Sequence, residues 1–508
     1  MATRKSFLEN PRIALGVLAG YFLLHLLLRS VISDSLQNDE AEQSLVTQVW
    51  LWGYGSQPPL YTWLQIPLFA LFGVNVFALS LLKNLLLFSI YLFTWLTARE
   101  IFQEAIHATL ATFSLLLIVL FSWESQRDQT HLVLATAIAA ATMFVALRLF
   151  KTRGAGWYGL FGGLAGLGVL AKYNYAVVIV SLLLAGLSLP PFRSALLNRK
   201  LLLTVACFLL VVAPHADWAW THPKLLLSQS NKFEIPKSGD FLLASLKGAG
   251  RLLKRIGEFV VGPVLVYGLL LIRSRKLATS SADRLSVTLI QRTMLIGLVL
   301  CLIAVLAFHV TMIRARWLQP LLISLPLVIT AWAQPRLDAN RIKAVFALAG
   351  LVMLAVPTAL YGTVAAAGWF GGPSNLNVPY RTFAEQIRAT GFTRGVILAD
   401  GHLVAGNLRL CFPDSTIMAV SNVRVPVPAP NQATILLVWR PESAQKVPDA
   451  LRRFATRDFH VDPESLHPQR VAAPAFYAPN KSESLCFAMV PARGSETNAP
   501  AAHGSAMQ

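Results

Sequence analysis

Long apolar runs recur along most of the chain and are separated by short polar connections. Most runs approach the length of about 20 residues at which a helix crosses the hydrocarbon layer of a bilayer. The pattern therefore predicts a polytopic α-helical membrane protein. Eleven membrane segments are predicted, at residues 13–33, 73–98, 105–123, 129–150, 157–172, 174–190, 200–216, 258–273, 292–312, 316–333 and 342–368.

The basic residues indicate how these segments are oriented, because cytoplasmic connections of membrane proteins are enriched in Lys and Arg. With the N-terminus inside, the loops 34–72 and 217–257 face out, and so does the region from about residue 374 onward. The first run lacks a small-residue cleavage site and is predicted to be retained as a helix. The connections predicted to be cytoplasmic carry Arg99; Arg148, Lys151 and Arg153; Arg193, Arg199 and Lys200; Arg273, Arg275, Lys276 and Arg284; and Arg336, Arg341 and Lys343.

The chain changes character after the membrane domain predicted over residues 1–373. Short β-prone runs at 395–399 and 434–439 lie among polar and proline-rich segments, and 383–388 is predicted to be a short helix. Helix and strand together predict a small α/β domain over 374–494. The tail 495–508, rich in Ala, Ser and Gly, is predicted to be disordered.

Composition supports the membrane assignment. Only 14% of residues are charged, 55% are hydrophobic and the mean hydropathy is +0.55, whereas a soluble protein carries roughly a quarter charged residues. The net charge of +19 comes from 44 Lys and Arg against 25 Asp and Glu. In a soluble domain that excess would suggest nucleic acid, but here it is expected largely in loops facing anionic lipid, and no nucleic-acid partner is predicted.

The four cysteines do not form a disulfide framework. Cys207 and Cys301 lie in apolar runs and are predicted to be packing residues. Cys411 and Cys486 share the C-terminal region and would be able to pair in an oxidising compartment. Their spacing alone does not decide whether they do.

An acidic cluster follows the first apolar run, with Asp39, Glu40 and Glu42 at the start of the first outer loop. Ionisable groups at the membrane are functional candidates, although Asp39 would alternatively cap an amphipathic helix predicted over 40–52. Pro58-Pro59 is expected to stop one interfacial helix and start the next. The loop's aromatic residues are interpreted as an interfacial belt rather than a sugar-stacking platform.

Other polar residues are predicted on the same outer side. Lys172, Arg314 and Arg316 are positive charges on the predicted outer side, where the positive-inside bias does not account for them. They would suit an anionic lipid head group such as a phosphate. Their alternative roles are snorkelling for Lys172 and anchoring of a tight turn for the two arginines. Asp128 would alternatively cap the following helix, and His222 is expected to be exposed rather than a metal ligand. The outer-side residues are Glu124, Arg127, Asp128, Lys172, Asp217, His222, Lys224, Arg314 and Arg316.

Both signs of charge fit sugar transfer from a lipid phosphate. A carboxylate is needed to orient or deprotonate the acceptor hydroxyl. Cations are needed to stabilise the charge that develops on the departing phosphate. The long lipid chain would lie between helices while its head group enters an outer vestibule.

The first outer loop strongly resembles glycosyltransferase family 39, which contains bacterial lipid A aminoarabinose transferases and relatives of protein O-mannosyltransferases. The resemblance extends over about residues 10–370 and is sharpest over 35–100. It rests on Asp39-Glu40-Ala41, on Gly-Tyr-Gly-Ser-Gln-Pro-Pro-Leu-Tyr-Thr-Trp-Leu at 53–64, on Leu-Phe-Gly at 71–73, on Gly-Leu-Gly-Val-Leu-Ala-Lys-Tyr-Asn at 166–174 and on Arg-Trp-Leu-Gln-Pro-Leu-Leu at 316–322.

The resemblance implies a GT-C fold with a catalytic first outer loop, a polyprenyl-phosphate sugar donor and inversion at the sugar carbon. The family's first-loop acidic residue falls on Asp39, with Glu40 beside it, and its second on Asp128. Lys172, Arg314 and Arg316 are chosen on physical grounds as donor phosphate ligands. This chain has Ser56-Gln57 where many relatives have an acidic residue or histidine, and no metal or other cofactor is predicted as obligatory. Gln57 and Tyr54 are predicted to position substrate.

The sequence thus predicts an inverting glycosyltransferase of the bacterial inner membrane with a periplasmic active site. Its acceptor would be lipopolysaccharide or lipid A, another glycan or a protein. A transporter or lipid flippase is the alternative, but it would place charges at mid-membrane and show internal repeats. A non-catalytic envelope scaffold would leave the first-loop carboxylates unexplained.

Overall fold

The computed structural model describes residues 10–55, 57–226, 233–236, 239–272, 274–275, 281–369, 372–420, 434–441, 446–462, 464 and 466–490. Ser56 and the predicted tail 495–508 lie outside these residues. The chain forms two compact units. The first comprises residues up to Ile32 and Trp50–Thr363, and the second comprises Ser33–Val49 and the chain from Val364 onward. The predicted division at residue 374 places Ser33–Val49 in the membrane domain, whereas the second compact unit includes this segment. The predicted domain boundaries stay a prediction.

The first unit is helical, and each of the eleven predicted membrane segments falls on helix. Six described helices are long and apolar enough to cross a membrane, or nine if three bent pairs each count as one crossing. The count of eleven crossings therefore stays a prediction. The main elements are α1 (Pro11–Ile32), α3 (Leu60–Phe72), α4 (Val76–Ile101), α5 (Ala105–Phe113), η2 (Ser114–Leu117), η3 (Leu120–Glu124), α6 (Ser125–Arg127), α7 (His131–Thr152), α8 (Ala155–Ala171), α9 (Tyr175–Leu187), α10 (Pro190–Leu196), α11 (Leu201–Thr221), α12 (Pro223–Leu226), α13 (Phe241–Leu271), α14 (Arg284–Ala307), η5 (Ala315–Leu318), α15 (Gln319–Leu322), α16 (Leu325–Ala333), η6 (Gln334–Arg336) and α17 (Ala339–Ala365).

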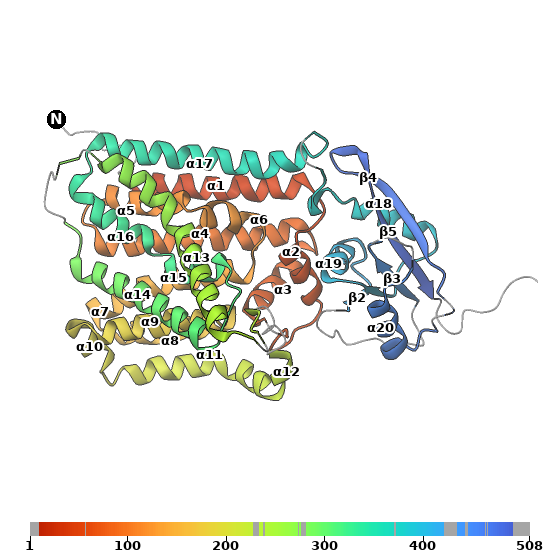
Figure 1. Ribbon diagram of the computed structural model, residues 1–508, viewed down its shortest axis with the longest axis horizontal. Helices are drawn as coiled ribbons and strands as arrows, with labels where there is room; N and C mark the ends of the chain where they lie inside the picture. The colour runs from red at the N-terminus through yellow and green to blue at the C-terminus, as the bar shows by residue number, and fades with distance from the viewer. Residues whose placement is uncertain are drawn as a thin grey trace, which may run out of the picture. The chain divides into compact units, whose positions relative to one another are not determined.

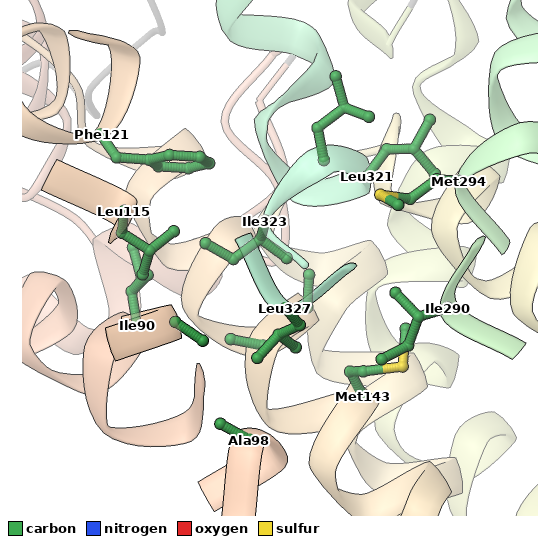
Figure 2. Close-up of a cluster of buried hydrophobic side chains, with 14 of the residues drawn as sticks. Ile90, Ala98, Leu115, Phe121, Met143, Ile290, Met294, Leu321, Ile323 and Leu327 are labelled. Carbon is green, nitrogen blue, oxygen red and sulfur yellow. The ribbon is translucent and has the colours of Figure 1, made fainter. Parts of the chain in front are cut away.

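The core of this unit is built from side chains of many helices. Figure 2 shows Ile90 of α4, Met143 of α7, Ile290 of α14 and Leu327 of α16 around a common interior, and all four are buried. Because lipid tails are as apolar as these side chains, close van der Waals contact rather than exclusion from water holds such helices together. Helices α1 and α17 lie side by side (Figure 1), and His25 and Tyr361 join them by a hydrogen bond of 3.2 Å.

Helix α8 approaches α11 closely through glycine. A Cβ added at Gly162 would lie 2.1 Å from the carbonyl oxygen of Thr204, whereas one added at the neighbouring Gly163 would meet nothing within 4 Å. Gly162→Ala is therefore expected to destabilise the protein by about 1–3 kcal/mol. Gly163→Ala is the matched control and is expected to keep or raise stability, since alanine is the better helix former. Thermal unfolding of the two variants in detergent checks this, and equal melting temperatures would contradict the close contact.

The second unit is an α/β domain, as the sequence predicts. Its five-stranded sheet has the order β2-β1-β3-β5-β4, with β1 parallel to β2 and β3, and β5 antiparallel to β3 and β4. Helices α18 and α19 contribute to the core on one face of the sheet and α20 to the core on the other (Figure 1). The elements are α2 (Asn38–Val46), η7 (Asn375–Asn377), α18 (Tyr380–Ala389), β1 (Val396–Ala399), α19 (His402–Cys411), β2 (Thr416–Ala419), β3 (Ile435–Trp439), α20 (Asp449–Phe459), β4 (Gln469–Ala475) and β5 (Ala478–Val490).

Two expectations for this region are resolved by the structure. The end predicted for the helix 40–52 is wrong, because α2 ends at Val46. The hydroxyl of Thr47 bonds back to the carbonyl of Gln43 at 2.9 Å, and the chain then leaves the helical path. The pairing of Cys411 with Cys486 is not present, since both thiols are free and they pack in the cores on opposite faces of the sheet.

Candidate active site

The acidic helix α2 belongs to the second unit, although it follows the first membrane helix in sequence. Gln37 is its N-cap, so the capping role considered for Asp39 is wrong. The Glu40 carboxylate is buried and accepts a hydrogen bond from the Gln37 backbone N–H at 3.0 Å, which caps the helix. Asp39 is half-buried in the first turn, where the positive end of the helix dipole stabilises a carboxylate.

The other predicted site residues belong to the first unit, where Tyr54 and Gln57 form a tight turn. Their backbones exchange two hydrogen bonds of 3.3 Å, and Gly55 between them has the positive φ of +67° that glycine adopts without strain. The buried Tyr54 hydroxyl accepts from the Leu51 N–H at 3.0 Å, and burial raises the pKa of this phenol. The turn presents the Gln57 side chain, whose Oε1 accepts from the Lys172 ammonium at 3.5 Å.

His215 in α11 holds the segment before this turn. A carbonyl only accepts, so Nδ1 of His215 donates to the Trp52 carbonyl (2.6 Å), and in the neutral ring Nε2 accepts from the Tyr173 hydroxyl (3.0 Å). The rings of Tyr173, His215 and Trp218 stack with centroids 5.8 and 5.6 Å apart. A Cβ at Gly53 would lie 2.2 Å from the Trp218 ring. These contacts join Trp52 and Gly53 to Tyr173, the residue directly after Lys172.

Asp128 lies half-exposed at the end of a connection that begins with a π-helical turn, η3. Such turns occur often at functional sites. The Lys83 ammonium donates to the carbonyl of Gln126 at 3.2 Å, and the Gln319 amide donates to the Ser125 hydroxyl at 3.2 Å. Side chains from α4 and α15 therefore fix the short helix α6 immediately before Asp128.

The start of α7 links the Asp128 connection to Lys172. The ring of His131 lies 5.4 Å from that of Tyr61 in α3, and a hydrogen bond with the Ala171 backbone joins His131 to the residue before Lys172. The structure thus gathers Gln57, Lys172 and the segment after Asp128 within the first unit.

Arg314 and Arg316 flank the start of the short helix η5. The side-chain amide of Asn174 donates to the Trp317 carbonyl at 2.8 Å, so the connection that carries Lys172 contacts the helix that carries Arg316. Arg314 is exposed and Arg316 is half-buried. Within the part of the chain that the structure describes, neither guanidinium forms an ion pair.

Sequence reasoning missed two arginines that hold this segment. Arg251 of α13 donates to the Thr311 carbonyl at 2.6 Å, and Arg255 of α13 donates to the Ile313 carbonyl at 3.1 Å. Both carbonyl groups lie within the three residues before Arg314. Both arginines lie in the predicted outer loop 217–257, yet α13 begins at Phe241, well before the predicted segment 258–273. The available signal was Asp240, whose carboxylate caps this helix by accepting from the Leu243 N–H.

A metal site is not apparent in the residues described. Among them, no group of three or more His, Cys, Asp or Glu side chains is placed to hold a metal ion.

Comparison with known proteins identifies the family. A family model described as dolichyl-phosphate-mannose-protein mannosyltransferase matches residues 56–218. The lipopolysaccharide core galacturonosyltransferase RgtB of Rhizobium johnstonii is 34% identical over 428 residues, which cover 84% of this chain and 86% of RgtB. This chain belongs to the GT-C membrane glycosyltransferases. RgtA of the same organism is 31% identical over 452 residues, covering 87% of this glycosyltransferase and 89% of RgtA.

Solved structures agree with the GT-C assignment at the level of the fold. ArnT from Cupriavidus metallidurans bound to undecaprenyl phosphate superposes with a TM-score of 0.60 at 14% identity, covering 93% of this glycosyltransferase and 97% of ArnT. Its apo structure gives a TM-score of 0.59. These structures confirm the predicted GT-C fold, and the identity to RgtB and RgtA confirms the predicted glycosyltransferase activity.

Proposed function

We propose that this glycosyltransferase moves galacturonic acid from a polyprenyl-phosphate donor to the core of lipopolysaccharide. The observation that carries the sugar and the acceptor is the 34% identity to RgtB over 84% of the chain. The lipid donor is supported by the fold shared with ArnT, whose structure contains undecaprenyl phosphate. We also propose an inner-membrane location with the active site on the periplasmic face, which the orientation predicted from the basic residues supports.

In the proposed reaction the acceptor hydroxyl attacks the anomeric carbon of the sugar while the bond from that carbon to the phosphate oxygen breaks. The Asp39 carboxylate takes the hydroxyl proton. Polyprenyl phosphate leaves with the bonding electron pair, so its head group changes from a singly to a doubly charged phosphate. A single displacement of this kind inverts the configuration of the sugar.

The developing charge on the phosphate is the proposed target of Lys172, Arg314 and Arg316. Arginine suits this task because its planar guanidinium binds phosphate with two donors. The exposed Arg314 guanidinium and the half-buried Arg316 support the assignment, since neither is occupied by a described carboxylate. An anionic sugar such as a uronic acid would meet the same cations.

The remaining candidates receive supporting roles. Asp128 is the proposed second carboxylate. Gln57 is proposed to position substrate and Lys172 together, because its amide oxygen accepts from that ammonium. Tyr54 acts indirectly through the turn that presents Gln57, and Glu40 acts indirectly by capping the helix of Asp39.

Transfer in isolated membranes tests the proposal. Membranes with and without the protein are given polyprenyl-phosphate donors that carry labelled galacturonic acid, aminoarabinose or mannose, together with lipopolysaccharide of complete or truncated core. We expect label from galacturonic acid in the complete core only, with loss of the lipid-linked donor. Transfer from aminoarabinose or mannose instead, or label in protein, would overturn the assigned sugar or acceptor.

A further inference from the structure

We infer that the C-terminal α/β domain is part of the catalytic machinery, because it is the body that holds the acidic helix α2. This inference rests on the proposed role of Asp39. Residues Ser33–Val49 form one compact unit with the chain from Val364 onward, although α2 precedes that domain by more than 300 residues of sequence. Asp39, the carboxylate proposed to act as the base, is therefore built on this domain.

The chain before α2 is tied to the domain by buried polar groups. The backbone N–H of Leu36 donates to the Asn407 side-chain oxygen at 2.8 Å. The hydroxyls of Ser33 and Ser35 donate to the carbonyls of Leu376 and Val378. Because Leu36 and both serines are buried, losing any of these bonds would leave a buried polar group unsatisfied.

Helix α2 itself crosses α19 at a glycine. A Cβ at Gly406 would lie 2.1 Å from the carbonyl oxygen of Ala41, so only glycine allows this approach of the two backbones. The Ser44 hydroxyl donates to the Gly406 carbonyl at 3.0 Å, and Leu45 is buried in the core formed by α18, α19 and the sheet. Figure 1 shows α2 and α19 side by side. The contact fixes α2 at Ala41, which is two residues after Asp39.

The chain after α2 is clamped to the edge of the sheet. The Gln48 amide donates to the Ile417 carbonyl and accepts from the Ile417 N–H, both at 2.9 Å. Strand β2 is the edge strand on this side, so Gln48 satisfies backbone groups that an open edge would expose. Asp39 is thus carried on a segment that is anchored before, within and after its helix.

Gly406→Ala tests this arrangement without touching Asp39. The added methyl group must push α2 away from α19, and a displacement of about 1 Å is enough to lower turnover by about 100-fold. We expect kcat for sugar transfer to fall, while KM for the lipid donor and the yield of folded protein change little. Gly401→Ala is the matched control, because a Cβ there meets nothing within 4 Å, and it is expected to transfer like the wild type.

A double-mutant cycle separates positioning from a general loss of folded enzyme. If α19 acts through Asp39, then Asp39→Asn in the Gly406→Ala protein will cost much less than it costs in the wild type. A reduced amount of folded protein would instead make the two losses multiply. Multiplying losses, or a Gly406→Ala protein as active as Gly401→Ala, would overturn the inference.

Gln48→Ala is the second variant, for the case in which Gly406→Ala does not accumulate. It removes the two hydrogen bonds to Ile417 and is expected to lower kcat several-fold. In the Gln48→Ala protein, Asp39→Asn is again expected to cost much less than it costs in the wild type. If the losses in kcat from the two substitutions multiply instead, the inference is overturned. An Asp39→Asn protein that transfers normally would remove the proposed role of Asp39. An inactive Asp39→Asn protein beside fully active Gly406→Ala and Gln48→Ala would refute only the role of the domain.

Discussion

Asp39→Asn is expected to lower kcat for sugar transfer by about 10²–10⁴-fold, the range that a general base contributes. Asparagine keeps the size of the side chain and its position in the first turn of α2 but does not accept the proton of the acceptor hydroxyl. KM for the lipid donor is expected to stay within a few-fold, because the proposed phosphate contacts come from other residues. Initial rates measured against donor and acceptor concentration separate the two constants.

Asp34→Asn provides the control for this variant. Asp34 is an exposed carboxylate five residues before Asp39 and pairs with Arg381 at 3.3 Å on the surface. Such pairs contribute only about 0–1 kcal/mol, so transfer is expected to be unchanged. An Asp39→Asn enzyme as fast as Asp34→Asn would remove Asp39 from the mechanism.

Lys172→Met is expected to lower kcat by about 10²–10³-fold, comparable to the loss of one group that stabilises a developing anion. Methionine keeps an unbranched side chain but removes the ammonium that contacts Gln57. The leaving phosphate carries more charge than the donor phosphate, so the variant should weaken inhibition by polyprenyl phosphate more than it raises KM for the donor. Product-inhibition kinetics measure both effects.

Lys247→Met is the matched control, since Lys247 is an exposed lysine of α13 to which no role in transfer is assigned. It is expected to leave transfer and product inhibition unchanged. If Lys172→Met changes both constants equally, the ammonium binds the lipid but does not favour its departure.

The sequence predicted those parts of the molecule whose signal is local. The apolar runs marked the helices, and the β-prone runs near Val396 and Ile435 became the parallel strands β1 and β3. Lys172 directly follows the glycine-rich helix α8, as the sequence predicted. In each case neighbouring residues carry the information, since hydrophobic period and turn chemistry are short-range properties.

The contacts that join distant segments could not be predicted in the same way. Leu45 is an apolar residue of a short amphipathic helix, and nothing near it in sequence distinguishes burial in a protein core from burial in the membrane interface. Gly406 likewise has meaning only because the backbone of Ala41 lies against it. Arg251 and Arg255 were missed for a related reason, because their partners are carbonyl groups about 60 residues away.

The distance along the chain between α2 and α19 sets an order of events during synthesis. Leu36 and its partner Asn407 are 371 residues apart, so at about 5–20 residues per second the partner is made roughly 20–75 seconds after the acidic helix. Throughout that interval the membrane helices emerge while Asp39 has no folded domain to hold it. A chain interrupted before α19 would carry its complete set of predicted membrane segments but no partner for α2, so on the proposed role of Asp39 sugar transfer is expected only after the C-terminal α/β domain has folded.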